Sequence, residues 1–116
     1  MGKPNGRSAL GRAGERRAAE WYRAHGYAVL ERNWSCPLGE IDLICARGRT
    51  LVVCEVKSRT STVHGHPLEA VTPAKQRRLR RLAVAYLRSK PGPWADVRFD
   101  VATLVGATLS VLEYAF

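Results

Sequence analysis

Four ionisable side chains lie beside two apolar stretches in the middle of the chain: Glu40 and Asp42 in the first, Glu55 and Lys57 in the second. Both stretches have the pattern of β-strands, and the short Gly-containing segment between them predicts a β-hairpin. Strand side chains alternate between two faces, so each pair shares a face and the hairpin brings the pairs together. Carboxylates at the ends of apolar strands are costly to desolvate unless they are paired or bind a cation.

Two interpretations of this cluster stay open. One is a structural ion pair, such as Asp42 with Lys57, at the rim of a sheet. The other is a divalent metal site, because Mg²⁺ is usually held by one or two carboxylates together with waters and substrate phosphates. A nearby lysine would then orient an attacking water or neutralise charge that develops on a phosphate. An E-x-K pattern alone is weak, but an aspartate thirteen residues before Glu55, in the partner strand, favours the metal site.

The composition favours one folded domain with a polyanionic partner. The chain has 116 residues, of which 46% are hydrophobic and 25% charged, as is usual for a folded domain. Nineteen Lys and Arg against ten Asp and Glu give a formal charge of +9, which favours nucleic acid as the partner. No long apolar span or aromatic amphipathic anchor accompanies this charge, so no membrane partner is expected.

The N-terminal residues and the cysteines give predictions about the cellular location of the protein and about zinc binding. Residues 1–7 are polar and are predicted to form a flexible arm before a single domain over residues 8–116. The opening residues lack the apolar segment of a signal peptide, which predicts a cytoplasmic protein. The three cysteines have no C-x-x-C spacing, so a zinc site is not expected, and Cys45 and Cys54 are predicted to be small core residues.

Capping residues and periodicity place the elements that must position these side chains. Ser8 is the predicted cap of a first helix, and Thr72 followed by Pro73 marks the start of a second. The predicted elements are a helix over residues 9–25, strands over 27–34, 41–46 and 51–56, a helix from residue 73, and strands over 97–105 and 108–114. The order αβββαββ predicts an α/β fold with a single mixed β-sheet flanked by helices.

The first helix carries two glycines and a glutamate next to its apolar stripe. Gly11 and Gly14 each weaken a helix by about 1 kcal/mol relative to alanine, so we expect a close approach of backbone or ligand there. Glu15 lies beside the apolar stripe and can point toward the sheet. Periodicity alone favours the other interpretation of Glu15, a solvated ion pair with an arginine such as Arg12.

The second helix divides into an inward and an outward set of polar residues. Lys75 and Gln76 precede Leu79 by one turn on the buried stripe, near the positive end of the helix, and would face the carboxylates. The arginines on its outer side are either a solvated face or a contact to a nucleic-acid backbone, and the spacing does not decide between the two. The outward arginines assigned to a nucleic-acid contact are Arg77, Arg78 and Arg81.

Four further positions have less specific signals. Arg59 continues the alternation of Glu55 and Lys57 and is expected to reach a phosphate. His64 and His66 lie in a loop rich in Gly and Pro, where solvent exposure or a phosphate contact is favoured over metal ligation. Asp100 would either join the carboxylates or pair with an arginine such as Arg98, and the pairing is favoured.

Several motifs, taken together, resemble a known family. They are G-x-x-G-E at residues 11–15, GEIDLI at 39–44, CEVKSR at 54–59, TPAKQ at 72–76 and RFDV at 98–101. In this order and over nearly the whole chain, they resemble the UPF0102, or YraN, family of small bacterial proteins. That family is similar to the PD-(D/E)XK nuclease fold, especially to archaeal Holliday junction resolvases, which implies a restriction-endonuclease-like core.

The resemblance implies a role for each motif residue. Asp42 and Glu55 would be ligands of Mg²⁺ or Mn²⁺, Lys57 the catalytic lysine, and Glu15 the helical glutamate that completes the site. Either Lys75 or Gln76 would be a supporting polar residue. The chain departs from the motif in having isoleucine instead of proline before the aspartate, a common variation, and all the catalytic residue types are present.

The function implied is metal-dependent hydrolysis of phosphodiester bonds in DNA, with branched or structured DNA as the expected substrate. Junction-cleaving enzymes usually act as symmetric dimers, so a homodimer is possible, although no residue identifies a dimer surface. Two other functions stay open. One is a nucleic-acid-binding module without catalysis, acting in DNA repair or recombination, and the other is a small basic protein that binds a protein partner or RNA.

Overall fold

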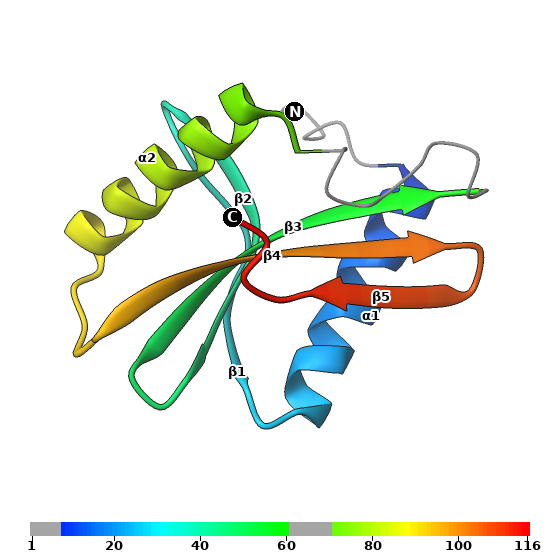
Figure 1. Ribbon diagram of the computed structural model, residues 1–116, viewed down its shortest axis with the longest axis horizontal. Helices are drawn as coiled ribbons and strands as arrows, with labels where there is room; N and C mark the ends of the chain where they lie inside the picture. The colour runs from blue at the N-terminus through cyan, green and yellow to red at the C-terminus, as the bar shows by residue number, and fades with distance from the viewer. Residues whose placement is uncertain (1–7, 61–70) are drawn as a thin grey trace.

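The computed structural model describes residues 8–60 and 71–116 and shows one five-stranded sheet with a helix on each face (Figure 1). Its elements are α1 (Ala9–Ala24), β1 (Ala28–Cys36), β2 (Gly39–Arg47), β3 (Thr50–Arg59), α2 (Pro73–Ser89), β4 (Asp96–Val105) and β5 (Thr108–Leu112). The prediction of an α/β fold with one mixed sheet is confirmed. The predicted N-terminal arm over residues 1–7 and the loop with His64 and His66 lie outside the described residues.

The sheet has the strand order β1-β2-β3-β4-β5. Neighbouring strands are antiparallel except for β3 and β4, which run parallel from Thr50↔Asp96 to Arg59↔Val105. A parallel pair requires a long crossover, and here the connection contains α2. Within this connection α2 runs back across the sheet, from above the middle of β3 toward the end at which β4 begins (Figure 1).

Both helices begin at the predicted caps. The Ser8 hydroxyl accepts a hydrogen bond from the Gly11 N–H at 3.0 Å, and the Thr72 hydroxyl accepts one from the Lys75 N–H at 3.2 Å. These bonds satisfy backbone donors that a first helical turn leaves without partners. Neither helix among residues 8–60 and 71–116 combines the length and apolar character that a membrane crossing needs.

Each face of the sheet buries its own hydrophobic cluster. On one face α2 packs four residues, Leu79, Leu82, Ala83 and Tyr86, against strand residues that include Ile41, Val53 and Val101. On the other face α1 packs Ala18, Ala19 and Tyr22 against residues that include Leu43, Cys45 and Cys54. Alternation assigns Leu43 and Cys45 to one face and Ile44 to the other, but it is interrupted at Asp42, because Ile41 and Leu43 lie on opposite faces. The prediction that Cys45 and Cys54 are buried core residues is confirmed.

A buried ion pair lies inside the cluster on the α1 side. Asp100 is fully buried and accepts two hydrogen bonds from the Arg98 guanidinium, at 2.9 and 2.8 Å. The Tyr22 hydroxyl and the Tyr114 backbone N–H also donate to Asp100. The favoured interpretation of Asp100, pairing with Arg98, is confirmed, and this aspartate ties α1 and the C-terminal segment to β4.

Candidate active site

A cleft opens where β2 and β3 stop pairing. Their antiparallel ladder runs from Arg47↔Thr50 to Leu43↔Cys54 and goes no further. Two residues beyond, the Val56 backbone N–H donates to the Asp42 carboxylate of β2 at 2.9 Å instead of to a β2 backbone carbonyl. The separated strands and the first turns of α1 enclose an open, largely polar space of about 300 Å³.

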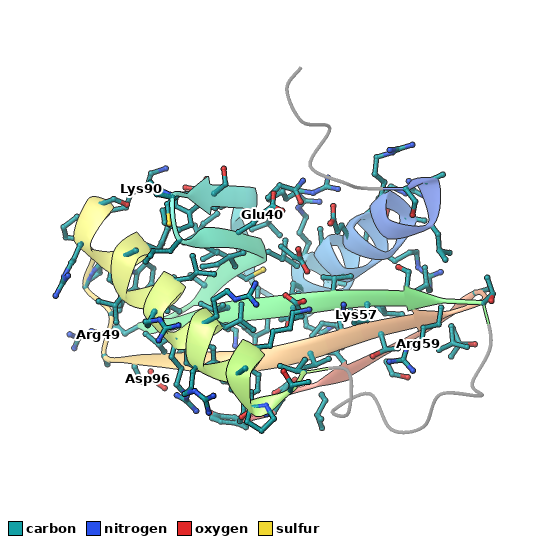
Figure 2. The ribbon with its side chains drawn as sticks, turned by 90° about the horizontal axis from the view of Figure 1, so that it is seen from above. Glu40, Arg49, Lys57, Arg59, Lys90 and Asp96 are labelled. Atoms are coloured by element: carbon teal, nitrogen blue, oxygen red, sulfur yellow. The ribbon has the colours of Figure 1, made fainter. Side chains whose placement is uncertain are left out.

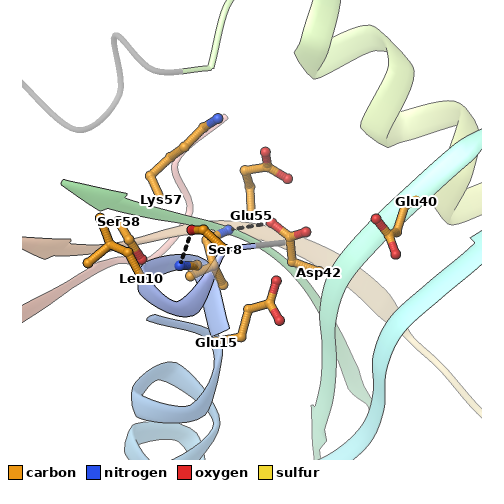
Figure 3. A pocket seen from close by; sticks show the side chains of 10 residues that line it. Ser8, Leu10, Glu15, Glu40, Asp42, Glu55, Lys57 and Ser58 are labelled. Carbon is orange, nitrogen blue, oxygen red and sulfur yellow. Dashed lines mark hydrogen bonds between the residues drawn. The ribbon is translucent and has the colours of Figure 1, made fainter. Parts of the chain in front are cut away.

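Four carboxylates and one ammonium side chain line this cleft. Glu15 comes from α1, Glu40 and Asp42 from β2, and Glu55 and Lys57 from β3. Figure 3 shows the Glu15, Asp42 and Glu55 side chains gathered at its centre, with Glu40 farther along β2. The structure thus brings together the four residues predicted to be catalytic, which lie on three separate elements.

The approach of α1 to the cleft depends on Gly14. A Cβ atom at Gly14 would lie 2.1 Å from the Ser58 Oγ and 3.3 Å from the Val56 Cγ1. The helix backbone therefore packs directly against β3, and the expected close approach is confirmed at this glycine. A Cβ atom at Gly11 would meet only the Ser8 Oγ, at an ordinary 3.6 Å, so packing does not require a glycine there.

Glu15 is buried as a consequence of this contact. Only 5% of the residue is exposed, and it lines the cleft beside Asp42 and Glu55. The interpretation of Glu15 as a solvated residue, which helical periodicity favoured, is therefore wrong. Periodicity describes the neighbours of a residue along its own helix, whereas the burial of Glu15 is set by β2 and β3.

The pKa of Asp42 is strongly raised by its surroundings. Burial and the nearby negative charge of Glu55 raise the pKa of Asp42 to about 7, with a smaller contribution from Glu15, although the hydrogen bond from the Val56 N–H acts in the opposite direction. Two carboxylates this close cannot both ionise easily without a compensating cation. Perturbed titration in a cleft is typical of functional sites.

Two lysines supply positive charge to this acidic centre. The Lys75 Nζ lies 2.7 Å from the Glu55 Oε2. Burial acts to lower the pKa of Lys75, but the ion pair with Glu55 outweighs it and the pKa is raised. Burial, and then the neighbouring Lys75, lower the pKa of Lys57. The two lysines thus lie close together, and Lys75 compensates part of the charge of the carboxylates.

The other predicted residues of α2 do not enter the cleft. The Gln76 side chain donates to the Val71 carbonyl at 3.1 Å, so of the two candidate supporting residues only Lys75 contacts a carboxylate. The exposed arginines at positions 77, 78 and 81 lie on the outer surface of the helix. Arg59 is partly buried at the far end of β3 (Figure 2).

Two residues were missed or left unassigned by the sequence patterns. The Ser58 hydroxyl is buried, has no hydrogen-bond partner among the described residues, and lines the cleft. Strand alternation gives no signal for Ser58, because it faces α1 and not the side of Lys57; only the G-x-x-G spacing of the first helix hints at it. The Arg80 guanidinium lies over Phe99 and Phe116, at 4.8 and 5.5 Å from the ring centroids, and covers the core.

The donor set suits a hard divalent cation. Carboxylate oxygens of Asp42 and Glu55 are the ligands that Mg²⁺ and Mn²⁺ prefer. Within residues 8–60 and 71–116, no three His, Cys, Asp or Glu side chains converge into a complete ligand set. Asp42 and Glu55 could supply the one or two carboxylates by which Mg²⁺ is commonly bound, with waters and substrate phosphates as its remaining ligands.

Comparison with known proteins identifies relatives over most of the chain. The family model described as "Uncharacterised protein family UPF0102" matches residues 14–104. A "UPF0102 protein" of Mycolicibacterium vanbaalenii is 49% identical over 98 residues, which cover 84% of this chain and 81% of the relative. Another of Acidothermus cellulolyticus is 42% identical over 130 aligned residues, covering 99% of this chain and 98% of the relative.

Proposed function

The chain belongs to the uncharacterised protein family UPF0102, and from that premise we propose that it is a divalent-metal-dependent endonuclease with a PD-(D/E)XK-like core. It would hydrolyse phosphodiester bonds in DNA, with branched or structured DNA as the substrate. One observation carries the proposal: Glu15, Asp42 and Glu55, from three elements, meet in one polar cleft that Lys57 also lines.

Each residue of the cleft has a distinct role in this proposal. Asp42 and Glu55 would hold Mg²⁺ or Mn²⁺, which lowers the pKa of water and stabilises charge on a phosphate. Lys57 would orient the attacking water and neutralise charge that develops on the scissile phosphate. Val56 fixes the Asp42 carboxylate through its backbone N–H, so the carboxylate is oriented before any substrate arrives.

The basic surface would position the DNA backbone. The chain has a net charge of +9, and exposed arginines at positions 77, 78 and 81 extend along α2 from the end that carries Lys75. Arg59 would add a contact at the end of β3. Contacts of this kind hold phosphates and fix the register of the nucleic acid without reading bases, which suits an enzyme that recognises a DNA structure.

A second candidate is a nucleic-acid-binding module that cleaves nothing and acts as an accessory in DNA repair or recombination. The exposed arginines of α2 favour it, because they would hold a phosphate backbone without any help from the carboxylates. The carboxylate cluster argues for the enzyme, since a purely binding surface has no use for buried acids near a polyanion.

Cleavage of labelled single-stranded, duplex, flapped and four-way-junction DNA with Mg²⁺ or Mn²⁺ distinguishes the two candidates. The Asp42→Ala variant should lose cleavage yet bind DNA as well as the original protein or better, since one negative charge is gone. The substrate that is cut identifies the class of nuclease. If both proteins bind DNA and neither cuts any substrate, the enzyme proposal fails and the binding module replaces it.

A further inference from the structure

The ion pair between Lys75 and Glu55 engages a carboxylate that the proposed metal site would use as a ligand. The Lys75 Nζ lies 2.7 Å from the Glu55 Oε2, and the two side chains are 27% and 9% exposed. Resting on the proposed function, we propose that Lys75 is a built-in counterion of the cleft. It neutralises Glu55 while no metal is bound, leaves Glu55 when a divalent cation enters, and then faces the substrate phosphate.

The charges in the cleft explain why a counterion is needed. Glu15, Asp42 and Glu55 line the cleft, and the charges of Lys57 and Lys75 act on Glu55 and Asp42. Without the ion pair, Glu55 would lose the cation that contacts it at 2.7 Å, and the repulsion between Glu55 and Asp42 would be less compensated. The ion pair therefore holds the metal-free cleft together.

The same geometry makes Lys75 and a metal ion competitors. Mg²⁺ binds oxygen at about 2.0–2.1 Å. An ammonium group and a divalent ion that share the Glu55 Oε2 would therefore be no more than about 5 Å apart, where like charges repel strongly. Glu55 lines the open cleft, so a metal ion would reach its carboxylate from the cleft side. Metal binding thus requires Lys75 to leave.

Lys75 is placed so that it can leave without unfolding the helix. It lies in the first turn of α2, where the Thr72 hydroxyl caps its backbone N–H and holds the main chain independently of the side chain. Its side chain is long and flexible, and it reaches Lys57. Once Lys75 has left Glu55, the ammonium groups of Lys57 and Lys75 would face a phosphate together. Bound metal would then raise the affinity of the protein for the phosphate, and bound phosphate would raise its affinity for the metal.

Calorimetric titration with Mn²⁺ alone, without DNA, tests this inference. Lys75→Gln should bind Mn²⁺ at least about tenfold more tightly than the original protein, because the competing cation is gone. Lys75→Arg keeps the charge and should stay near the original affinity. Lys90→Gln is the matched control, since Lys90 forms an ion pair with Glu31 at the other end of α2, and it should change nothing.

The outcomes separate the inference from the proposed function. Suppose that the original protein binds Mn²⁺ and that Asp42→Asn abolishes this binding, so that the metal site stands. If Lys75→Gln then binds Mn²⁺ with unchanged or weaker affinity, Lys75 is not a competitor and the inference is overturned. Binding by Lys75→Gln but not by the original protein supports the inference. If neither protein binds Mn²⁺, the metal site itself fails, and the inference fails with it. Far-UV circular dichroism confirms that each variant is folded.

Discussion

Val56 donates its backbone N–H to the Asp42 carboxylate, at 2.9 Å, two residues beyond the last pair of the β2–β3 ladder. The carboxylate thus satisfies a backbone donor of β3 that lies beyond the ladder with β2. The same hydrogen bond fixes Asp42 at the mouth of the separated strands, between Glu15 and Glu55. It therefore links the local end of the hairpin to the geometry of the candidate site.

The raised pKa of Asp42 predicts that stability falls as the pH rises. Burial and Glu55 move this pKa from 3.8 to about 7, so the folded protein keeps a proton that the unfolded chain releases. The stabilisation is fully present below about pH 4 and is lost as the pH rises through about 7, with a slope of at most about 1.4 kcal/mol per pH unit. Urea unfolding between about pH 4.5 and 8 measures this slope.

The Asp42→Asn variant is the control for that slope. The amide oxygen can still accept from the Val56 N–H, but the side chain no longer titrates. The variant should therefore show a flatter dependence of the free energy of unfolding on pH than the original protein. Identical slopes in the two proteins would show that Asp42 titrates normally.

Gly14 and Gly11 make a matched pair for testing how α1 is seated. Gly14→Ala should destabilise the protein by about 1–3 kcal/mol, because its Cβ would crowd the Ser58 Oγ and the Val56 side chain. Gly11→Ala meets no such crowding and should stabilise the helix by up to about 1 kcal/mol. Thermal unfolding of the two variants measures the difference.

Ser58→Ala supplies the double-mutant test of the same contact. The Ser58 hydroxyl has no partner among the described residues, so its removal alone should cost little. Combined with Gly14→Ala it should restore much of the stability, because the atom 2.1 Å from the new Cβ is gone. Additive effects of the two substitutions would mean that the helix does not rest on β3 at this point.

Local patterns predicted the elements better than the packing between them. Ser8, Thr72 and Pro73 carry their helix-start signals in their own side chains, and the helix predicted over residues 9–25 is observed at Ala9–Ala24. Strand alternation likewise placed Asp42 and Glu55 at the opening of one hairpin. Such signals need only a few neighbouring residues, which is why they can be read from the sequence.

Contacts across the fold could not be predicted in the same way. Glu15 is buried because Gly14 lets α1 approach a strand more than forty residues later in the chain, at Val56 and Ser58. The inward position of Lys75 was predicted, but not its ion pair with Glu55, because the pattern of one helix does not show which strand atoms face it. The site is thus formed by packing between distant segments of the chain, which the residue pattern of a single helix or strand does not reveal.

Asp100 should matter for stability and not for chemistry. Asp100→Asn removes the buried counterion of the Arg98 guanidinium, which is 4% exposed, and leaves it the more distant and more exposed Glu113 at 3.7 Å; this should cost about 3 kcal/mol. Asp96→Asn in the same strand is the control: Asp96 is exposed and accepts one hydrogen bond, from Thr50, so this substitution should cost less than about 1 kcal/mol. Urea unfolding at about pH 7 compares them, and equal destabilisation would refute the structural role.

The arginines of α2 should control the salt dependence of DNA binding. Replacing Arg77, Arg78 and Arg81 together by alanine should reduce the slope of log affinity against log salt by roughly 3 units, about 0.9 for each phosphate that an arginine neutralises. Arg23→Ala, in the exposed last turn of α1, is the control and should leave the slope nearly unchanged. An unchanged slope in the triple variant would show that these arginines of α2 do not contact the DNA backbone.

The comparison of three isosteric variants, Glu15→Gln, Asp42→Asn and Glu55→Gln, tests most directly whether the cleft is a nuclease site. Each should reduce the rate of DNA cleavage with Mg²⁺ or Mn²⁺ by about 100-fold or more while DNA binding persists. Asp96→Asn, which lies outside the cleft, should cleave normally. If the original protein cuts DNA and the three variants cut it equally well, these carboxylates are not the catalytic centre.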